Sequence, residues 1–232
     1  MARALAIETS SRIGSVAAVD GENLLAEEQF PHGLQHAAMI LPIIDRLCRA
    51  QGWSPRDVEH LYISAGPGSF TGLRIGVTLA KTMALATGMK VVAVPTARVL
   101  AENAPAGARH IVIVLDAKRD QVFTARFERI GGDWSEREPA QLASLHDILS
   151  RAPRPVHLLG EGIPYHQKFI PADDPGIIVT PPERWRPQAG VVARLGTAMA
   201  GAGRFIDPDS FTPIYIRKPE AEEKWETLHP ST

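Results

Sequence analysis

The stretch Gly66-Pro-Gly-Ser-Phe-Thr-Gly72 runs directly into a segment in which a small residue recurs at every fourth position, at Gly72, Gly76, Ala80, Ala84 and Gly88. Residues four apart lie on one face of a helix, so this spacing predicts a helix with one face nearly free of side chains. Such a face lets another element approach closely, as small residues do between packed helices. The approaching element can be this chain's own sheet or a partner protein.

The residues before this helix predict a strand, a glycine loop and a helix start in that order. Residues 61–65 form a short apolar run typical of a buried parallel strand, and Ser69 or Thr71 can cap the helix. Backbone N–H groups at such a loop can hold a phosphate or a carboxylate. The spacing matches neither a P-loop nor Gly-x-Gly-x-x-Gly, because Lys81 lies well inside the helix. Tight turning and close packing are the other interpretation of these glycines.

Composition limits the classes of protein that this chain can be. Its 232 residues are enough for one large domain or two small ones. A formal net charge of −1 argues against a free-standing nucleic-acid binder, whose affinity depends on neutralising phosphates. The single cysteine, Cys48, excludes an internal disulfide. With no membrane span and no signal peptide in the pattern, we expect a cytoplasmic protein.

The order of expected elements suggests that one α/β unit occurs twice. Each unit opens with a strand hairpin that has a polar turn. We expect an N-terminal subdomain over 1–105, a C-terminal subdomain over 110–216 and a tail over 217–232. The expected strands are 4–8, 14–20, 24–29, 61–65, 91–94, 111–116, 122–129, 156–159 and 177–179, and the expected helices are 36–51, 72–88, 96–103, 145–151 and 188–200.

Several separate motifs resemble one family. They are Ile7-Glu-Thr-Ser10 with Ser15-Val-Ala17, the run 66–76, Asp116 through Phe123, and Pro213-Ile-Tyr215 with Arg217. Together they resemble the TsaB (YeaZ) family over nearly the whole chain. The resemblance implies the duplicated fold of the actin, sugar-kinase and heat-shock-chaperone (ASKHA) superfamily, with two subdomains that each carry a mixed sheet and packed helices.

The resemblance also implies a function in tRNA modification. The family contributes to forming N6-threonylcarbamoyladenosine beside the anticodon of tRNAs that read codons beginning with A. It implies a non-catalytic subunit that supports the sister transferase TsaD, with the ATPase TsaE as a further partner and tRNA contacted only through the complex. No cofactor is required on this interpretation.

The sequence lacks the metal pair that the sister transferase carries. That pair is His-x-x-x-His just after the strand that follows the small-residue helix, where this chain has Thr96 and Leu100. An aliphatic side chain supplies no lone pair to a metal. His32 and His36 have the same spacing elsewhere, but no third ligand is evident nearby, and a structural or interface role fits His36 better. We therefore expect no metal.

A degenerate nucleotide site is the interpretation that we favour for the polar turns. In the superfamily these turns meet phosphate, and the matching residues here are Glu8, Thr9 and Ser10, with Asp116 opening the second unit and Gly160 in a possible adenine-side loop. ATP or ADP could bind there or at the interface of the complex. The alternative is that these residues form turns and buried hydrogen bonds.

The resemblance points to the first two helices as the surface for the partner. In the family, these helices from two proteins pack as a four-helix layer. Because this kind of surface is self-complementary, we expect a homodimer through the same helices when the partner is missing. The alternative is that the small-residue face packs on this chain's own sheet. The expected interface residues are His36, Met39, Ile43, Leu47, Gly72, Arg74, Gly76 and Ala80.

Two other classes of function stay open at this stage. An ATP-dependent small-molecule kinase of the same superfamily needs a carboxylate base, for which Asp116 is the one candidate that we can place. An autonomous RNA-binding module needs a basic patch and stacking aromatic residues, and the sequence shows neither motif.

Overall fold

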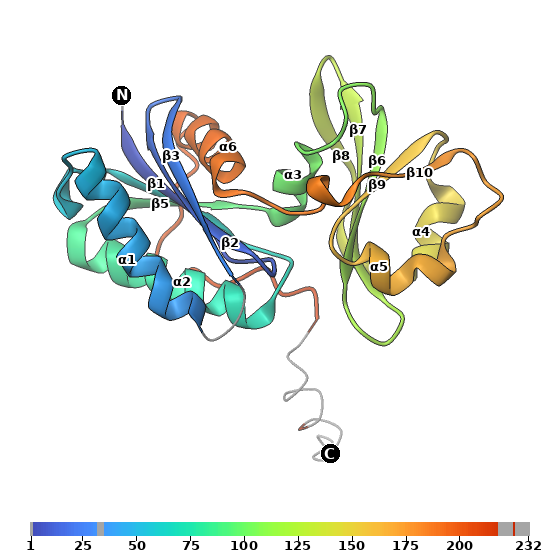
Figure 1. The fold of residues 1–232 in the computed structure, drawn as a ribbon, viewed down its shortest axis with the longest axis horizontal. Helices are drawn as coiled ribbons and strands as arrows, with labels where there is room; N and C mark the ends of the chain where they lie inside the picture. The colour runs from blue at the N-terminus through green and yellow to red at the C-terminus, as the bar shows by residue number, and fades with distance from the viewer. Residues whose placement is uncertain (1, 32–34, 218–224, 226–232) are drawn as a thin grey trace.

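The described residues form two five-stranded sheets, each covered by helices on both faces (Figure 1). The computed structural model describes residues 2–31, 35–217 and 225, and the side chains of 35–37 are outside that description. His32 and most of the expected tail over 217–232 therefore lie outside the described residues, and His36 is described by its backbone alone. Within the described part of the chain, no helix combines the length and the apolar character that crossing a bilayer needs.

The first sheet has the strand order β3-β2-β1-β4-β5. Side chains alternate across it, so Leu5 and Ile7 face one core while Ala4 and Ala6 face another. Two helices cover the first face and α6 covers the second (Figure 1). The bounds are β1 Arg3–Glu8, β2 Gly14–Asp20, β3 Asn23–Phe30, α1 Gln35–Ala50, β4 His60–Ser64, α2 Phe70–Thr87, β5 Lys90–Val94 and α6 Ala189–Gly201.

The second sheet has the strand order β10-β9-β6-β7-β8. Helices α4 and α5 cover its outer face, and α3 packs on the face turned toward the first sheet (Figure 1). The bounds are α3 Thr96–Ala101, β6 His110–Asp116, β7 Val122–Ile130, β8 Asp133–Ala143, α4 Leu145–Arg151, β9 Val156–Leu159, α5 Ile163–His166 and β10 Ile177–Val179.

The topology confirms the predicted duplication. In each half, the first strand pairs antiparallel with the second and parallel with the fourth, while the third and fifth strands lie at the two edges. The helices repeat as well, because α4 and α5 connect the second-half strands as α1 and α2 connect the first. The chain therefore has the two-subdomain α/β fold expected of the ASKHA type.

Each half supplies the helix that covers the inner face of the other half's sheet. Helix α3 follows the first sheet in sequence but packs on the second, with Ala97 and Leu100 in its core. Helix α6 follows the second sheet but packs on the first, and Ile206 beyond it pairs with Val91 of β5. The expected boundary near residues 105–110 thus falls between the two sheets in sequence, while α3 from the expected first unit and α6 from the expected second unit each pack on the other unit's sheet.

Candidate functional site

The turn after β1 buries a carboxylate. Glu8 is fully buried, and one of its oxygens accepts hydrogen bonds of 2.5 Å from both the backbone N–H and the hydroxyl of Ser10. Its other oxygen, like the hydroxyl of neighbouring Thr9, has no hydrogen-bond partner among the described residues. Burial raises the pKa of Glu8 to about 7, the bonds from Ser10 offset part of this rise, and the nearby charge of Glu161 adds to it. Glu8 therefore titrates near neutral pH.

The loop after β9 closes over this first turn. A carboxylate oxygen of Glu161 accepts from the backbone N–H of Arg12 at 3.2 Å, and Arg186 lies 3.4 Å from the other oxygen. Gly160 has a φ of 130°, and a Cβ there would lie 2.2 Å from the carbonyl oxygen of Val114. This glycine is thus required for close backbone packing on β6. Its role as a nucleotide contact stays a prediction.

Asp116 occupies the position in the second half that Glu8 occupies in the first. Its carboxylate accepts from the backbone N–H of Lys118 at 3.1 Å, from the Lys118 ammonium at 2.5 Å and pairs with Nε2 of buried His166 at 3.1 Å. Partial burial alone would raise its pKa, but the bonds from Lys118 and His166 outweigh burial and hold the pKa of Asp116 below its ordinary value. The two matching carboxyl groups therefore differ in charge near neutral pH.

The second turn is held in a strained backbone conformation. Lys118, Arg119 and Asp120 have φ values of 62°, 54° and 57°, in the left-handed region that side chains disfavour. A hydrogen bond from the N–H of Ala117 to the carbonyl of Gln121, 3.0 Å long, closes the turn. Residues in such conformations cost of the order of 1–3 kcal/mol each and persist where the surroundings fix them, often at functional sites.

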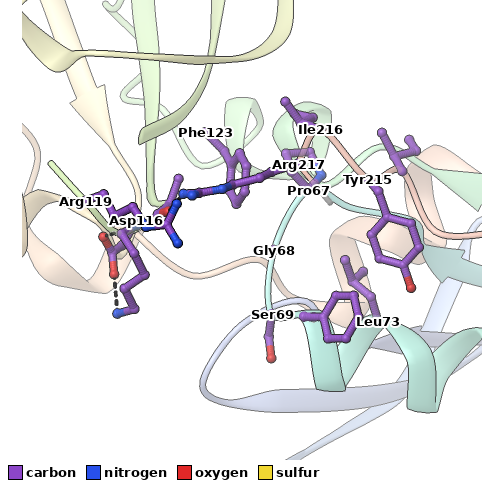
Figure 2. A pocket seen from close by; sticks show the side chains of 14 residues that line it. Pro67, Gly68, Ser69, Leu73, Asp116, Arg119, Phe123, Tyr215, Ile216 and Arg217 are labelled. Atoms are coloured by element: carbon purple, nitrogen blue, oxygen red, sulfur yellow. Dashed lines mark hydrogen bonds and ion pairs between the residues drawn. The ribbon is translucent and has the colours of Figure 1, made fainter. Parts of the chain in front are cut away.

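A cleft of about 420 Å³ separates the glycine loop from this second turn (Figure 2). The segment Ile214–Arg217 forms its third side: the N–H of Ile214 donates to Ala65 in the first half, and the Arg217 guanidinium donates to Ala117 in the second. The cleft is lined by Pro67, Gly68, Ser69, Phe70, Leu73, Asp116, Ala117, Lys118, Arg119, Phe123, Ile214, Tyr215, Ile216 and Arg217.

The predicted nucleotide residues lie on two neighbouring turns. Glu8, Thr9 and Ser10 lie beneath the loop that holds Gly160 and Glu161, and the same loop packs on the second turn, because a Cβ at Gly162 would lie 2.6 Å from the backbone nitrogen of Asp116. Sequence reasoning missed His166 and Glu161, which hold the two turns. A signal was present for Glu161, because Gly160-Glu-Gly162 follows β9 as Gly66-Pro-Gly68 follows β4.

The small-residue face of α2 packs against this chain's own sheet. A Cβ at Gly72 would lie 1.9 Å from the carbonyl oxygen of Thr9, and one at Gly76 would lie 2.6 Å from the Thr9 hydroxyl oxygen and 2.9 Å from Cδ1 of Ile63. Ala80 is fully buried. The expectation that these three residues face a partner is therefore wrong. Glycine is needed here because α2 crosses the first hairpin turn with no room for a side chain.

The other expected interface residues are divided between core and surface. Ile43 and Leu47 of α1 are buried in the core of the first half, Met39 is half-buried, and Arg74 is exposed. The expectation that Ile43 and Leu47 contact a partner is therefore wrong, because other residues of this chain already cover these two side chains. The outward faces of α1 and α2 instead present Leu41, 53% exposed, and Leu85, 88% exposed.

The positions that match the metal pair of the sister transferase lie in α3, with Thr96 at its first position and Leu100 near its end. Both Thr96 and Leu100 are buried there, and the Thr96 hydroxyl accepts a hydrogen bond from the N–H of Gly66 at 3.1 Å. Among the described residues, no group of three or more His, Cys, Asp or Glu side chains is arranged to hold a metal ion. Thr96 therefore anchors the glycine loop to α3.

Comparison with known proteins gives a consistent result. The family model for TsaD, tRNA N6-adenosine threonylcarbamoyltransferase, matches residues 32–169. The tRNA threonylcarbamoyladenosine biosynthesis protein TsaB of Bacillus subtilis is 31% identical over 226 residues, covering 95% of this chain and 96% of the relative. The chain belongs to the TsaB family. TsaB of Escherichia coli is 27% identical over 96% of this chain and 97% of its own.

A solved structure also supports the TsaB fold. YeaZ from Pseudomonas aeruginosa superposes with a TM-score of 0.78 at 23% identity, covering 93% of this chain and all of that one. At this identity the similarity shows the fold alone. The sequence comparisons therefore carry the TsaB assignment, and the superposition shows that the described chain has the same two-sheet arrangement.

Proposed function

We propose that this chain is a non-catalytic, activating subunit of the machinery that forms N6-threonylcarbamoyladenosine on tRNA. Its relatives over nearly full length are named for the biosynthesis of that nucleoside. The observation that carries the non-catalytic part is at α3, where buried Leu100 packs in the second core and the Thr96 hydroxyl is bonded to Gly66. These side chains cannot form the two-imidazole metal site of the sister transferase.

The partner in this proposal is a TsaD-type paralogue that docks on the outward faces of α1 and α2. Leu41 and Leu85 supply exposed apolar area, and each fully buried side chain of this kind is worth roughly 1.5–3 kcal/mol. The same surface can pair with a second copy when the paralogue is missing. A TsaE-type ATPase and tRNA would join through the complex.

The geometry gives less support to a small-molecule kinase. A kinase base must reach the hydroxyl of its acceptor, but Asp116 is engaged by Lys118 and His166. The first turn, where a kinase would hold phosphate, is covered by Glu161. Kinase chemistry needs an open phosphate turn in each half, and the described residues of the two turns do not provide this pair.

Reconstitution tests the proposed function. Unmodified tRNA would be incubated with a TsaD-type protein, a TsaE-type ATPase, ATP and threonylcarbamoyl-adenylate, with and without this chain, and the modified nucleoside measured by mass spectrometry. We expect modification only when this chain is present, and none from this chain alone. Equal modification in its absence would refute the activating role, and modification by the chain alone would refute the non-catalytic one.

A further inference from the structure

The first turns of α2 carry an arginine that two aromatic rings hold in place. The guanidinium carbon of Arg74 lies 3.8 Å from the ring centre of Phe70 and 6.0 Å from that of Tyr215. Its Nε donates to the Tyr215 hydroxyl at 3.1 Å, and the two ring centres are 5.4 Å apart. Because Tyr215 belongs to the segment that crosses between the halves, a contact between residues 141 apart in sequence fixes this exposed side chain.

The charge of Arg74 is not compensated within the described part of the chain. Among the described residues, no carboxylate forms an ion pair with its guanidinium, and Tyr215 engages only Nε. Arg46 and Arg49 on α1, in contrast, each pair with a carboxylate of this chain. Lys81, the other basic residue of α2, donates to a backbone carbonyl. The two terminal nitrogens of Arg74 are therefore available to a group on another molecule.

The immediate surroundings of this arginine are apolar and aromatic. Ile214 is 41% exposed and Tyr215 is 40% exposed, while Phe70 is half-buried. In Figure 2, Tyr215 lies on the α2 side of the cleft, away from Asp116 and Arg119. RNA binding depends on several cations that neutralise phosphates together, whereas arginine and tyrosine among apolar side chains are typical of the centre of a protein interface. The composition therefore favours a protein partner.

Arg74 lies on the same face of α2 as Leu85, which belongs to the docking surface proposed above. The two residues are eleven positions apart, which is about three full turns of a helix and about 16 Å along its axis. Thr78 between them is exposed as well. The outward face of α2 thus has an apolar end at Leu85 and a cationic end at Arg74.

We propose that the TsaD-type partner presents an Asp or Glu side chain to Arg74, and that this ion pair fixes the register of the partner along α2. The inference rests on the proposed function, because it names the chemistry that the proposed docking surface recognises. A guanidinium binds both oxygens of one carboxylate. Since two rings already hold Arg74 in place, it loses little conformational entropy on binding, and the apolar side chains around it keep water from the ion pair.

The affinity of the purified full chain for a TsaD-type protein, measured by calorimetry, tests this contact. Arg74→Ala should weaken binding by about tenfold or more. Arg74→Lys keeps the charge but loses the two-point geometry and the stacking, so it should recover only part of the affinity. Arg137→Ala is the matched control, because Arg137 is also exposed but lies on β8 in the second half. Thermal unfolding of each variant checks that the fold is retained.

A double-mutant cycle identifies the residue on the partner. Each acidic residue on the docking face of the TsaD-type protein would be replaced by its amide, alone and in combination with Arg74→Ala. For one of them, we expect the two changes together to weaken binding by clearly less than the product of their separate effects. A purely structural role of Arg74 would not produce this coupling, and coupling to none of these residues would overturn the inference.

The remaining outcomes separate this inference from the proposed function. A complex that Leu85→Glu abolishes, but that Arg74→Ala leaves as tight as Arg137→Ala does, would overturn the role of Arg74 and retain the docking surface. No complex with the unmodified chain would overturn both. Unchanged affinity between the proteins, with weaker binding of tRNA by the Arg74→Ala complex, would also overturn the inference and identify an RNA phosphate as the group that Arg74 binds.

Discussion

The close passage of α2 over the first turn makes Gly72→Ala a sensitive test of the fold. The added Cβ would lie 1.9 Å from the carbonyl oxygen of Thr9, whereas real Cβ contacts essentially never fall below 3.0 Å. The obstacle is backbone, so no side-chain rotation can relieve it. The helix start or the turn must move by about 1 Å, which strains the 2.7 Å hydrogen bond from the N–H of Ser69 to Ser10.

The expected magnitude follows from opposing effects. Overpacking in a buried contact costs about 1–3 kcal/mol, and loss of one hydrogen bond costs about 0.5–1.5 kcal/mol. Alanine recovers up to about 1 kcal/mol of helix propensity relative to glycine. We therefore expect Gly72→Ala to lower the free energy of unfolding by about 2 kcal/mol, or Tm by roughly 4–8 °C for a chain of this size.

Urea and thermal unfolding of the purified protein measure this change. The matched control is Gly201→Ala at the end of α6, where nothing lies within 4 Å of the added Cβ, and where stability should be unchanged or slightly higher. A Gly72→Ala protein as stable as the unmodified chain would refute the reasoning. Such a result would mean that α2 does not sit as close to Thr9 as the structure places it.

Three further predictions concern Glu8, the outward helix face and Asp116. Because burial raises the pKa of Glu8 from 4.5 to about 7, the native state holds its proton more tightly, and stability should fall by about 3 kcal/mol as the pH rises through that range. Glu8→Gln should remove this fall when the free energy of unfolding is measured in urea at several pH values. If that free energy depends on pH in the variant as it does in the unmodified chain, Glu8 is not the group that titrates. Leu85→Glu should abolish the complex with a TsaD-type protein in size-exclusion chromatography while Tm stays unchanged, because Leu85 is exposed on the outward face of α2. Leu25→Glu, at an exposed position on β3, is the control and should leave the complex intact. Equal loss of the complex in both variants would argue against the helix face as the docking surface. Lys118→Met should raise the pKa of Asp116 in an NMR titration because its principal hydrogen-bond donor is lost, and a pKa that does not move would show that other groups hold it low.

Local chemistry made much of the first half predictable. The order of strand, glycine loop and helix around residues 66–72 matches β4, the loop and α2, and Ser69 caps the helix by accepting from the N–H of Gly72. Turn chemistry and apolar runs also indicated the hairpins that open each half. These features depend on neighbours in sequence, so the sequence contains the information directly.

The partner of the small-residue face could not be predicted in the same way. Spacing identifies which residues share a helix face but not which element that face meets. Gly72 and Gly76 meet Thr9 and Ile63, which are distant in sequence. Only the three-dimensional arrangement distinguishes an internal contact from an interface, and the two interpretations had looked alike in the residues.

Strand β8 shows a second limit of sequence patterns. Its segment contains Pro139 and several charged residues, which do not resemble a strand. It forms at the sheet edge, where the register with β7 shifts near Pro139 and Glu138 pairs with Arg126 at 2.8 Å. Edge strands tolerate proline and charge. The pairing with β7 stabilises β8 despite its unfavourable residues, and the sequence of β8 alone does not indicate that pairing.

The exchange of α3 and α6 between the halves makes the chain a single cooperative unit despite its four separate hydrophobic cores. Cutting the chain between the sheets, after α3, would leave a first fragment whose apolar Ala4, Ala6 and Tyr62 face water, because α6 belongs to the second fragment. The second fragment would lose α3 and expose its own inner face in turn. Neither piece can bury its core alone, so a nick between the sheets would be tolerated only while both pieces stay associated.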